Sequence, residues 1–373
     1  MTTGRGGDPA RASLDADVLR WMRESTAWRG DDARFEELAL RLFAWQFEHC
    51  APYRRFCEGR GRTPRSLKRV GEIPPVPTGA FKELALTSFP LERTVHRFRT
   101  SGTSAGSRGV LHLDTLELYE AALLPSFRRG VLPDLGDGGR ARMAVLAPSA
   151  RELPESSLSH MFEVVLREHG DLASAYFVER GELDVERLLR FLDDACAAAE
   201  PVALCGTAFA FVHLLDALAL RGRALTLPTG TRALETGGFK GRARVRPQRE
   251  LYAEIEARLG IPAARIVNQY GMTELGSQFY DSVLAEPDAP RRKLAPPWTR
   301  VLIVDPLGGE PVPAGHTGSI VVQDLANTGS VFAVQTADLG VARGDGFEVI
   351  GREPGAEERG CSIALDELLG GAA

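Results

Sequence analysis

The sequence has 373 residues, 44% hydrophobic and 25% charged, which is usual for a chain of one or two globular domains. Its 45 Lys and Arg against 50 Asp and Glu give a formal net charge of −5, and this argues against a general nucleic-acid-binding protein. The sequence contains no apolar run long enough to cross a membrane and no apolar signal core near the N-terminus, and its five cysteines are scattered. These features predict a cytoplasmic protein without a membrane span.

The N-terminal part of the chain is predicted to be helical after a flexible start. Residues 1–30 are expected to be flexible, and Asp31 or Asp32 is expected to cap a helix with an apolar stripe. The proline-rich stretch 73–78 breaks regular structure, so residues 60–80 should form a packed connector.

Strand-like apolar runs alternate with helical patterns through the middle of the chain. This alternation predicts a mainly parallel α/β sheet with helices on its faces. The expected strands are 143–147, 202–205, 225–227 and 265–268, and the expected helices are 116–127, 156–168, 184–199, 207–221 and 248–259.

The pattern changes at about residue 298. Short apolar runs separated by Gly- and Pro-containing turns predict an antiparallel β subdomain over 298–352. The expected organisation is therefore a flexible N-terminus, an α/β core over 31–297, this subdomain, and a short C-terminal tail over 353–373.

Three segments carry residue types suited to a nucleotide. The first is the Ser/Thr/Gly-rich stretch from Thr100 to Gly109, whose backbone N–H groups and hydroxyls could surround an anion, with Arg99 and Arg108 adding positive charge. Its glycine spacing is not that of the P-loop NTPases. A flexible surface loop is the alternative interpretation.

The second segment, 267–276, leaves a predicted strand and turns at Gly271. This places Thr273 and Glu274 at the carboxyl end of a strand, where open α/β sheets bind ligands. A hydroxyl beside a carboxylate suits phosphate and Mg²⁺. The alternative is an ordinary strand and turn with a capping threonine.

The third segment runs from 334 to 352. Asp338 follows a predicted strand, where a carboxylate can accept hydrogen bonds from the two hydroxyls of a ribose. The Asp345-Gly346 pair taken alone indicates a hairpin turn.

In this order, the three segments resemble the core motifs of the adenylate-forming superfamily. Within it the chain is most similar to the LuxE-type acyl-protein synthetases, on the residues of 73–82, 100–109, 268–274 and 359–368. The resemblance runs from about residue 35 to the C-terminus. It implies the α/β fold of the N-terminal domain of adenylate-forming enzymes, with the C-terminal domain reduced to a short tail.

The resemblance also implies roles for individual residues. Glu274 matches the Mg²⁺ ligand and Thr273 the α-phosphate contact, while Tyr270, followed by Gly271, matches the ring that stacks on adenine. Further ATP contacts fall on the phosphate loop (Ser101, Gly102, Thr103, Ser104, Gly106), the adenine wall (Thr236, Gly237, Gly238, Phe239) and the ribose site (Asp338, Arg352), with His160 near the carboxylate pocket or simply packed in a helix.

The sequence departs from the family's pattern in two places, and both concern positive charge. Arg108 stands where the family's phosphate loop carries lysine, which keeps the charge but changes its geometry. Only 21 residues follow Arg352, and none of them is a lysine. The larger relatives supply a lysine at this stage from a C-terminal domain. Lys82 and Lys240 are candidates for that role, which the sequence leaves open.

Cys361 is the remaining candidate for a catalytic residue. It lies at the expected start of a short helix after Arg359, and both features lower a thiol pKa, although Glu357 and Glu358 oppose this. A lone cysteine in a tail ordinarily has no function. LuxE-type enzymes, however, take the acyl group onto a cysteine near the C-terminus, and Cys361 matches it.

The resemblance therefore implies an ATP-dependent ligase that uses Mg²⁺, activates a carboxylic acid, expected to be fatty, as acyl-AMP, and transfers the acyl group to Cys361. A reductase subunit or a carrier protein is the expected acceptor. The alternatives are direct transfer from acyl-AMP to CoA or a carrier, and a non-catalytic nucleotide-binding protein. The sequence does not specify the acid, the final acceptor or the oligomeric state.

Overall fold

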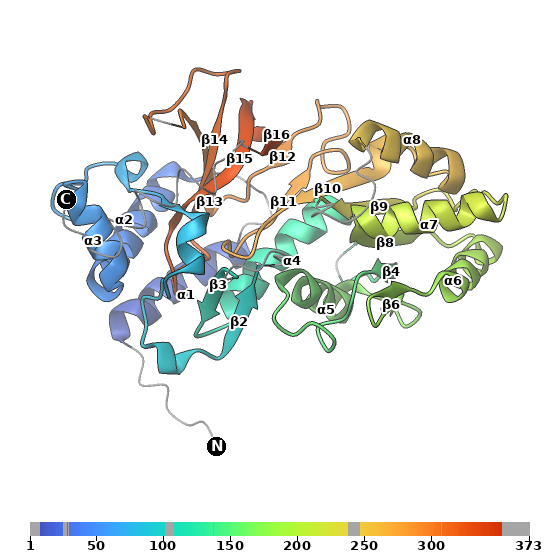
Figure 1. The fold of residues 1–373 in the computed structure, drawn as a ribbon, viewed down its shortest axis with the longest axis horizontal. Helices are drawn as coiled ribbons and strands as arrows, with labels where there is room; N and C mark the ends of the chain where they lie inside the picture. The colour runs from blue at the N-terminus through green and yellow to red at the C-terminus, as the bar shows by residue number, and fades with distance from the viewer. Residues whose placement is uncertain are drawn as a thin grey trace.

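The computed structural model describes residues 8–24, 28, 30–100, 108–136, 138–237, 247–306 and 308–352. Helices α1 to α3 gather at one end of the molecule and α6 to α8 at the other, with the strands between them (Figure 1). Among the described residues, no helix combines the length and the apolar character needed to cross a membrane. The helices are α1 (Pro9–Glu24), α2 (Asp32–His49), α3 (Ala51–Gly59), α4 (Glu117–Val131), α5 (Ser157–His169), α6 (Val185–Ala198), α7 (Ala208–Leu220) and α8 (Gln248–Leu259).

One large sheet organises the fold. Its strand order is β13-β14-β15-β16-β12-β11-β10-β9-β8-β4-β5, and β1 pairs with β15. Strands β10, β9, β8, β4 and β5 are parallel, whereas β11, β12 and β13 to β16 join antiparallel to their neighbours. Its strands are β1 (Val76–Pro77), β4 (Arg142–Leu146), β5 (Ala175–Tyr176), β8 (Val202–Thr207), β9 (Arg232–Thr236), β10 (Ile266–Tyr270), β11 (Phe279–Asp281), β12 (Lys293–Leu294), β13 (Thr299–Val304), β14 (Thr317–Asp324), β15 (Ala333–Arg343) and β16 (Gly346–Arg352).

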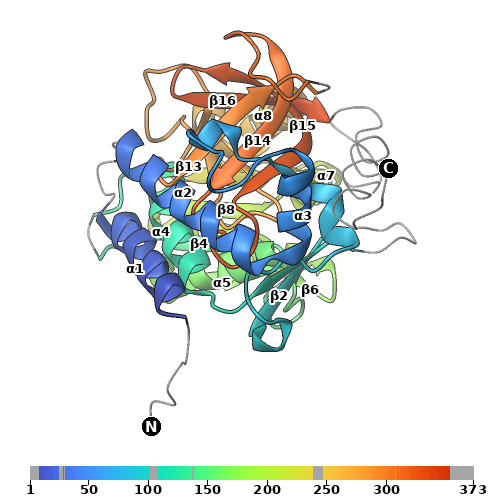
Figure 2. The same cartoon turned by 90° about the vertical axis from the view of Figure 1, so that its left-hand side faces the viewer.

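The parallel strands are buried on both faces, and their side chains alternate between two cores. Along β8, Ala203 and Cys205 belong to the core that contains α4 and α5, whereas Val202 and Leu204 belong to the core formed with α6, α7 and α8. Figure 2 shows the antiparallel strands β13 to β16 above the N-terminal helices. This architecture confirms the predicted α/β class with a parallel and an antiparallel part.

Two expectations are corrected. Residues Pro9–Glu24, which were expected to be flexible, form helix α1, because Leu14, Val18 and Trp21 recur at helical spacing and are buried. Residues 225–227 are not a strand, since the N–H groups of Leu225 and Leu227 donate to carbonyls at the C-terminal end of α8. The strand beside β8 is instead β9.

The expected helix cap is confirmed. Asp31 is the N-cap of α2, and its side chain accepts a hydrogen bond from the Arg34 N–H at 3.0 Å. The connector 60–80 is packed, as predicted, with Ile73 and Val76 buried. Its strand β1 joins β15 in parallel and so brings this part of the chain to the antiparallel strands.

Candidate active site

The Ser/Thr/Gly-rich segment stands at the tip of a two-stranded hairpin. Strands β2 (His96–Arg99) and β3 (Val110–Leu113) pair antiparallel. The hairpin continues to Thr100 and Gly109, because the Thr100 N–H donates to the Gly109 carbonyl at 2.9 Å. The Gly109 N–H in turn donates to Thr100 Oγ1 at 3.0 Å. The base of the loop is therefore closed, and Arg108 is exposed directly beside it.

The predicted phosphate contacts within the loop lie outside the described residues. These are Ser101, Gly102, Thr103, Ser104 and Gly106.

The Thr273-Glu274 turn lies against the base of that loop. Both residues are buried, and they follow β10, an interior strand that pairs with β9 and β11. A Cβ added to Gly109 would lie 3.4 Å from Glu274 Oε1 and 3.6 Å from Phe81 Cβ. Three segments far apart in sequence therefore meet at Gly109, and a glycine there leaves room for the carboxylate. Phe81 brings its neighbour, the half-buried Lys82, to the same region.

Two residues from the antiparallel part anchor this turn. Asn327 Nδ2 donates to the Glu274 carbonyl at 3.0 Å. Asp324, which is fully buried, accepts hydrogen bonds from the Ser277 N–H at 2.8 Å, the Ser277 hydroxyl at 2.8 Å and the Ala326 N–H at 2.9 Å. Burial raises the pKa of Asp324 to about 6, against the opposing effect of these donors. The position of Glu274 thus depends on strand β14.

Tyr270, Asp338 and Arg352 form a second cluster beside the turn. The Tyr270 hydroxyl donates to Asp338 Oδ2 at 3.0 Å, and Arg352 Nε lies 3.5 Å from Asp338 Oδ1. Burial raises the pKa of Tyr270 well above 10, so the hydroxyl remains a hydrogen-bond donor. Asp338 and Arg352 are register partners on β15 and β16. The structure therefore brings together three residues that the sequence analysis took from separate motifs.

The Tyr270 ring is held in a cluster of aromatic side chains. Its centroid lies 6.1 Å from that of Phe279 and 5.7 Å from that of Phe347, and the latter two are 5.4 Å apart. Edge-to-face contacts of this kind fix the orientation of the rings. The ring is consequently preorganised before any ligand binds.

The predicted glycines lie at the ends of the adjacent strands. Gly237 follows β9, and a Cβ there would lie 4.0 Å from Asn268 Nδ2. Gly271 follows β10, and a Cβ there would lie 2.8 Å from Gln269 Nε2, so a side chain would crowd the turn. Gly238, Phe239, Lys240 and Cys361 lie outside the described residues.

His160 lies on α5 among other aromatic rings. Its ring centroid is 5.5 Å from that of Phe98 and 5.7 Å from that of Tyr119. Its Nε2 lies 3.2 Å from Glu120 Oε1, and burial lowers the His160 pKa. The contact with Phe98 of β2 nevertheless links it to the hairpin that carries the loop.

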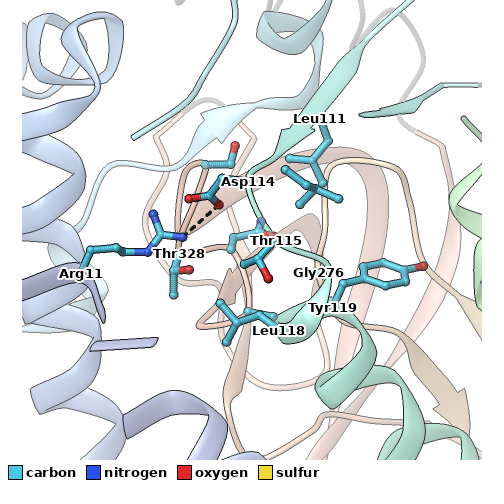
Figure 3. Close-up of a pocket in the computed structure, with 13 residues that line it drawn as sticks. Arg11, Leu111, Asp114, Thr115, Leu118, Tyr119, Gly276 and Thr328 are labelled. Carbon is cyan, nitrogen blue, oxygen red and sulfur yellow. Dashed lines mark hydrogen bonds and ion pairs between the residues drawn. The ribbon is translucent and has the colours of Figure 1, made fainter. Parts of the chain in front are cut away.

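A small cavity borders the site on the side of α1 (Figure 3). Gly276 and Leu111, each two residues beyond a site residue, contribute to its wall, and the Tyr119 ring closes one end. At the other end the buried Arg11 forms an ion pair with Asp114 at 3.3 Å. The cavity therefore changes from apolar to charged along its length.

Sequence reasoning did not single out several residues that shape the site. Asp324 and Asn327 anchor the Glu274 turn, and Lys293 contacts Asn268 beside Tyr270. An aspartate two residues after the short apolar run 320–322 was a usable signal, because a buried carboxylate needs donors. Across the residues that the structure describes, no group of three or more His, Cys, Asp or Glu side chains could hold a metal ion.

Solved structures with the same fold were found. Among them is 2-hydroxyisobutyryl-CoA ligase in an open conformation with 2-HIB-AMP and CoA, at 15% identity and a TM-score of 0.62, covering 88% of this chain and 77% of that one. The same ligase in the postadenylation state with R3-HIB-AMP gives 15% identity and a TM-score of 0.63, covering 89% and 70%. A comparison with curated proteins finds no match.

The fold is thus that of the adenylate-forming ligases. The sequence pattern of the family described as "Acyl-protein synthetase, LuxE" matches residues 12–370. The chain belongs to the LuxE acyl-protein synthetase family, as the motifs predicted. It is an ATP-dependent carboxylic acid ligase.

Proposed function

We propose that this enzyme converts a carboxylic acid and ATP to acyl-AMP and then transfers the acyl group to its own Cys361. The observation that carries the proposal is the meeting of three motifs: Gly109 at the loop base, Glu274, and the Tyr270–Asp338 pair. The family match extends to residue 370 and so includes Cys361.

The nucleoside is assigned to the Tyr270 cluster. The preorganised ring offers a flat apolar surface to the base, and Asp338 offers carboxylate oxygens to the ribose hydroxyls. Arg352 supplies a positive charge beside Asp338, where it can contact the ribose or a phosphate. The phosphates are assigned to the Thr100–Gly109 loop, with Thr273 at the α-phosphate and the exposed Arg108 compensating negative charge.

Glu274 fits a role as Mg²⁺ ligand. Mg²⁺ is commonly held by one or two protein carboxylates together with phosphate oxygens and water, and a single carboxylate at the loop base matches that donor set. When bound, Mg²⁺ would neutralise charge on the departing pyrophosphate. The Asn327 hydrogen bond keeps the Glu274 segment in place, and the absence of a side chain at Gly109 leaves room for the carboxylate.

The proposed chemistry has two steps. A carboxylate oxygen of the acid attacks the α-phosphorus of ATP, the bond to the β-phosphate oxygen breaks, and pyrophosphate leaves. The thiolate of Cys361 then attacks the acyl carbon of acyl-AMP, a thioester forms, and AMP leaves. Activation is required because a free carboxylate is a poor acyl donor, whereas AMP is a good leaving group.

The other cysteines support the choice of Cys361 by contrast. Burial raises the pKa of Cys50 to about 11 and that of Cys57 and Cys205 to about 12, so these thiols stay protonated. Cys196 is half-buried, and its pKa is also raised by burial. Cys361 lies nine residues beyond Arg352, a separation that spans up to about 30 Å of extended chain.

Three further assignments belong to the same proposal. The acid is fatty, its carboxylate lies on the His160 side of the site, and the acyl group passes from Cys361 to a reductase subunit or a carrier protein. Lys82, which follows Phe81 at the loop base, is the described lysine best placed to assist adenylation.

Intact mass spectrometry tests the proposal. Wild type, Cys361→Ala and the matched control Cys196→Ala are incubated with ATP, Mg²⁺ and a panel of fatty and aromatic acids, and pyrophosphate is measured in parallel. We expect a hydroxylamine-labile acyl increment on wild type and Cys196→Ala, and none on Cys361→Ala.

Each other outcome contradicts a different part of the proposal. Pyrophosphate release without any increment would indicate direct transfer to CoA or a carrier. An increment that persists in Cys361→Ala would place the acceptor elsewhere. Nucleotide binding without pyrophosphate release with any acid would indicate a non-catalytic protein.

A further inference from the structure

A row of polar side chains crosses four strands next to the site. Glu235 of β9 is the register partner of Asn268 of β10, and Asp281 of β11 is the partner of Lys293 of β12. The Asn268 N–H donates to Asp281 Oδ2 at 3.0 Å and so joins the two pairs. We call these four residues the polar row. Because side chains alternate along a strand, Asn268 shares its face of the sheet with Tyr270, two residues further on.

Lys293 is buried at the centre of the contacts in this row. Its Nζ donates to the Asn268 carbonyl at 2.7 Å, to Asn268 Oδ1 and to Asp281 Oδ1 at 2.8 Å. These three bonds use all three protons of the ammonium group. The other oxygen of Asp281 accepts from Arg291 at 2.6 Å, so each anion in the row has a cation or a donor beside it.

The contacts fix the orientation of the Asn268 amide without ambiguity. Lys293 can only donate, so the oxygen of the amide must face it. Nδ2 donates to Glu235 Oε1 at 2.7 Å, and the same oxygen accepts from the Tyr252 hydroxyl at 2.9 Å. A flipped amide would place its oxygen against a carboxylate and its N–H groups against an ammonium.

The fixed amide lies at the edge where the base is proposed to bind. Asn268 Nδ2 is 4.0 Å from the position of a Cβ on Gly237, at the end of β9, and Tyr270 ends the same strand as Asn268. The amide has two N–H groups, and the Glu235 bond uses one of them. The second can donate to N1 of adenine, which is an acceptor there but carries a hydrogen in guanine, so the orientation of the amide would determine the base choice.

We propose that Lys293 is a positioning residue for nucleotide selection: it locks the Asn268 amide in the orientation that matches adenine. The inference rests on the proposed function, since it takes the base to lie beside Tyr270. Arg291 provides a matched control because it pairs with the same Asp281, while its other hydrogen bonds go to the carbonyls of Ile266 and Ala263 and not to the Asn268 amide.

Calorimetric titration with ATP and with GTP tests this on the full chain. Lys293→Met should bind ATP about tenfold more weakly and lose about tenfold of the preference for ATP over GTP, while Arg291→Met stays within about twofold of wild type. If losing a cation at Asp281 had only a structural effect, the ATP affinity of both variants would fall alike. The preference for ATP over GTP would then be unchanged. Either of those results would overturn the inference.

A double-mutant cycle covers the case in which Lys293→Met does not fold, with Lys293→Gln as the substitute variant. If Lys293 acts through Asn268, adding the substitution at 293 to Asn268→Ala should change the ATP preference no further. Additive losses would refute the positioning role. Wild type that binds neither nucleotide would overturn the adenylate-forming proposal itself, which separates that failure from the failure of this inference.

Discussion

Asp324 offers a quantitative test of how the Glu274 turn is anchored. Its carboxylate is fully buried and accepts three hydrogen bonds, yet burial prevails and raises its pKa from 3.8 to about 6. A carboxyl group whose pKa is raised by folding holds its proton more tightly in the folded state. The contribution of this group to stability is therefore largest at low pH and falls as the pH rises toward 6.

The size of the effect follows from the two pKa values. They differ by about 2, which corresponds to about 3 kcal/mol between the fully protonated and fully ionised limits. Between about pH 4.5 and pH 7.5 the expected loss in the free energy of unfolding is about 2 kcal/mol, because part of the titration lies below that range. Asp324→Asn cannot titrate, so this loss is absent from the variant.

Urea unfolding of wild type and Asp324→Asn at both pH values measures this loss. The substitution also places an NH₂ group or a weaker acceptor against the Ser277 and Ala326 donors, a cost that applies at both pH values. We expect the stability advantage of wild type over the variant to shrink by about 2 kcal/mol from the lower to the higher pH. An advantage that grows with pH would show that the N–H donors outweigh burial, and the reasoning would be wrong.

Two other substitutions examine separate parts of the site. Tyr270→Phe removes the hydrogen bond to Asp338 but keeps the ring, so the KM for ATP should rise about fivefold to tenfold with an unchanged melting temperature; an unchanged KM would contradict the assigned role. Gly276→Ala would place a Cβ 2.7 Å from the Ala326 Cβ, so we expect about 1–3 kcal/mol of destabilisation in urea unfolding, whereas Gly71→Ala, with open space around it, should cost less than about 0.5 kcal/mol.

Features with a local signal could be predicted from the sequence. Asp31 caps α2 through a hydrogen bond to a residue three positions away, and the helix that ends near residue 259 follows an apolar period within one segment. Tyr270 and Asp338 could be proposed as site residues because their motifs are short and contiguous. That the Tyr270 hydroxyl donates to Asp338 was not predictable, since it depends on how β10 and β15 are placed in the sheet.

The contacts of the residues that the sequence analysis missed depend on how the strands pair in the sheet. Strand β9 was not predicted because Arg232 and Glu235 make it look polar. Each has a partner distant in sequence, since Arg232 pairs with the exposed Asp134 and Glu235 accepts a hydrogen bond from the buried Tyr252. Lys293 lies on a strand of only two residues, and its contacts with Asn268 exist only once β11 has been placed between them. A single sequence carries no local trace of such pairings.

The proposed active site lies where the parallel and antiparallel parts of the sheet meet, and this explains why its residues are so widely spaced in the chain. Strand β10 is the last parallel strand and supplies Tyr270, while the antiparallel strands beyond it supply Asp338 and Arg352. The short strands β11 and β12 span the gap, so the polar row that they carry is also what holds the two parts in register. Lys293 of β12 contacts Asn268 of β10 across β11, and this is the contact through which it is proposed to act on base recognition.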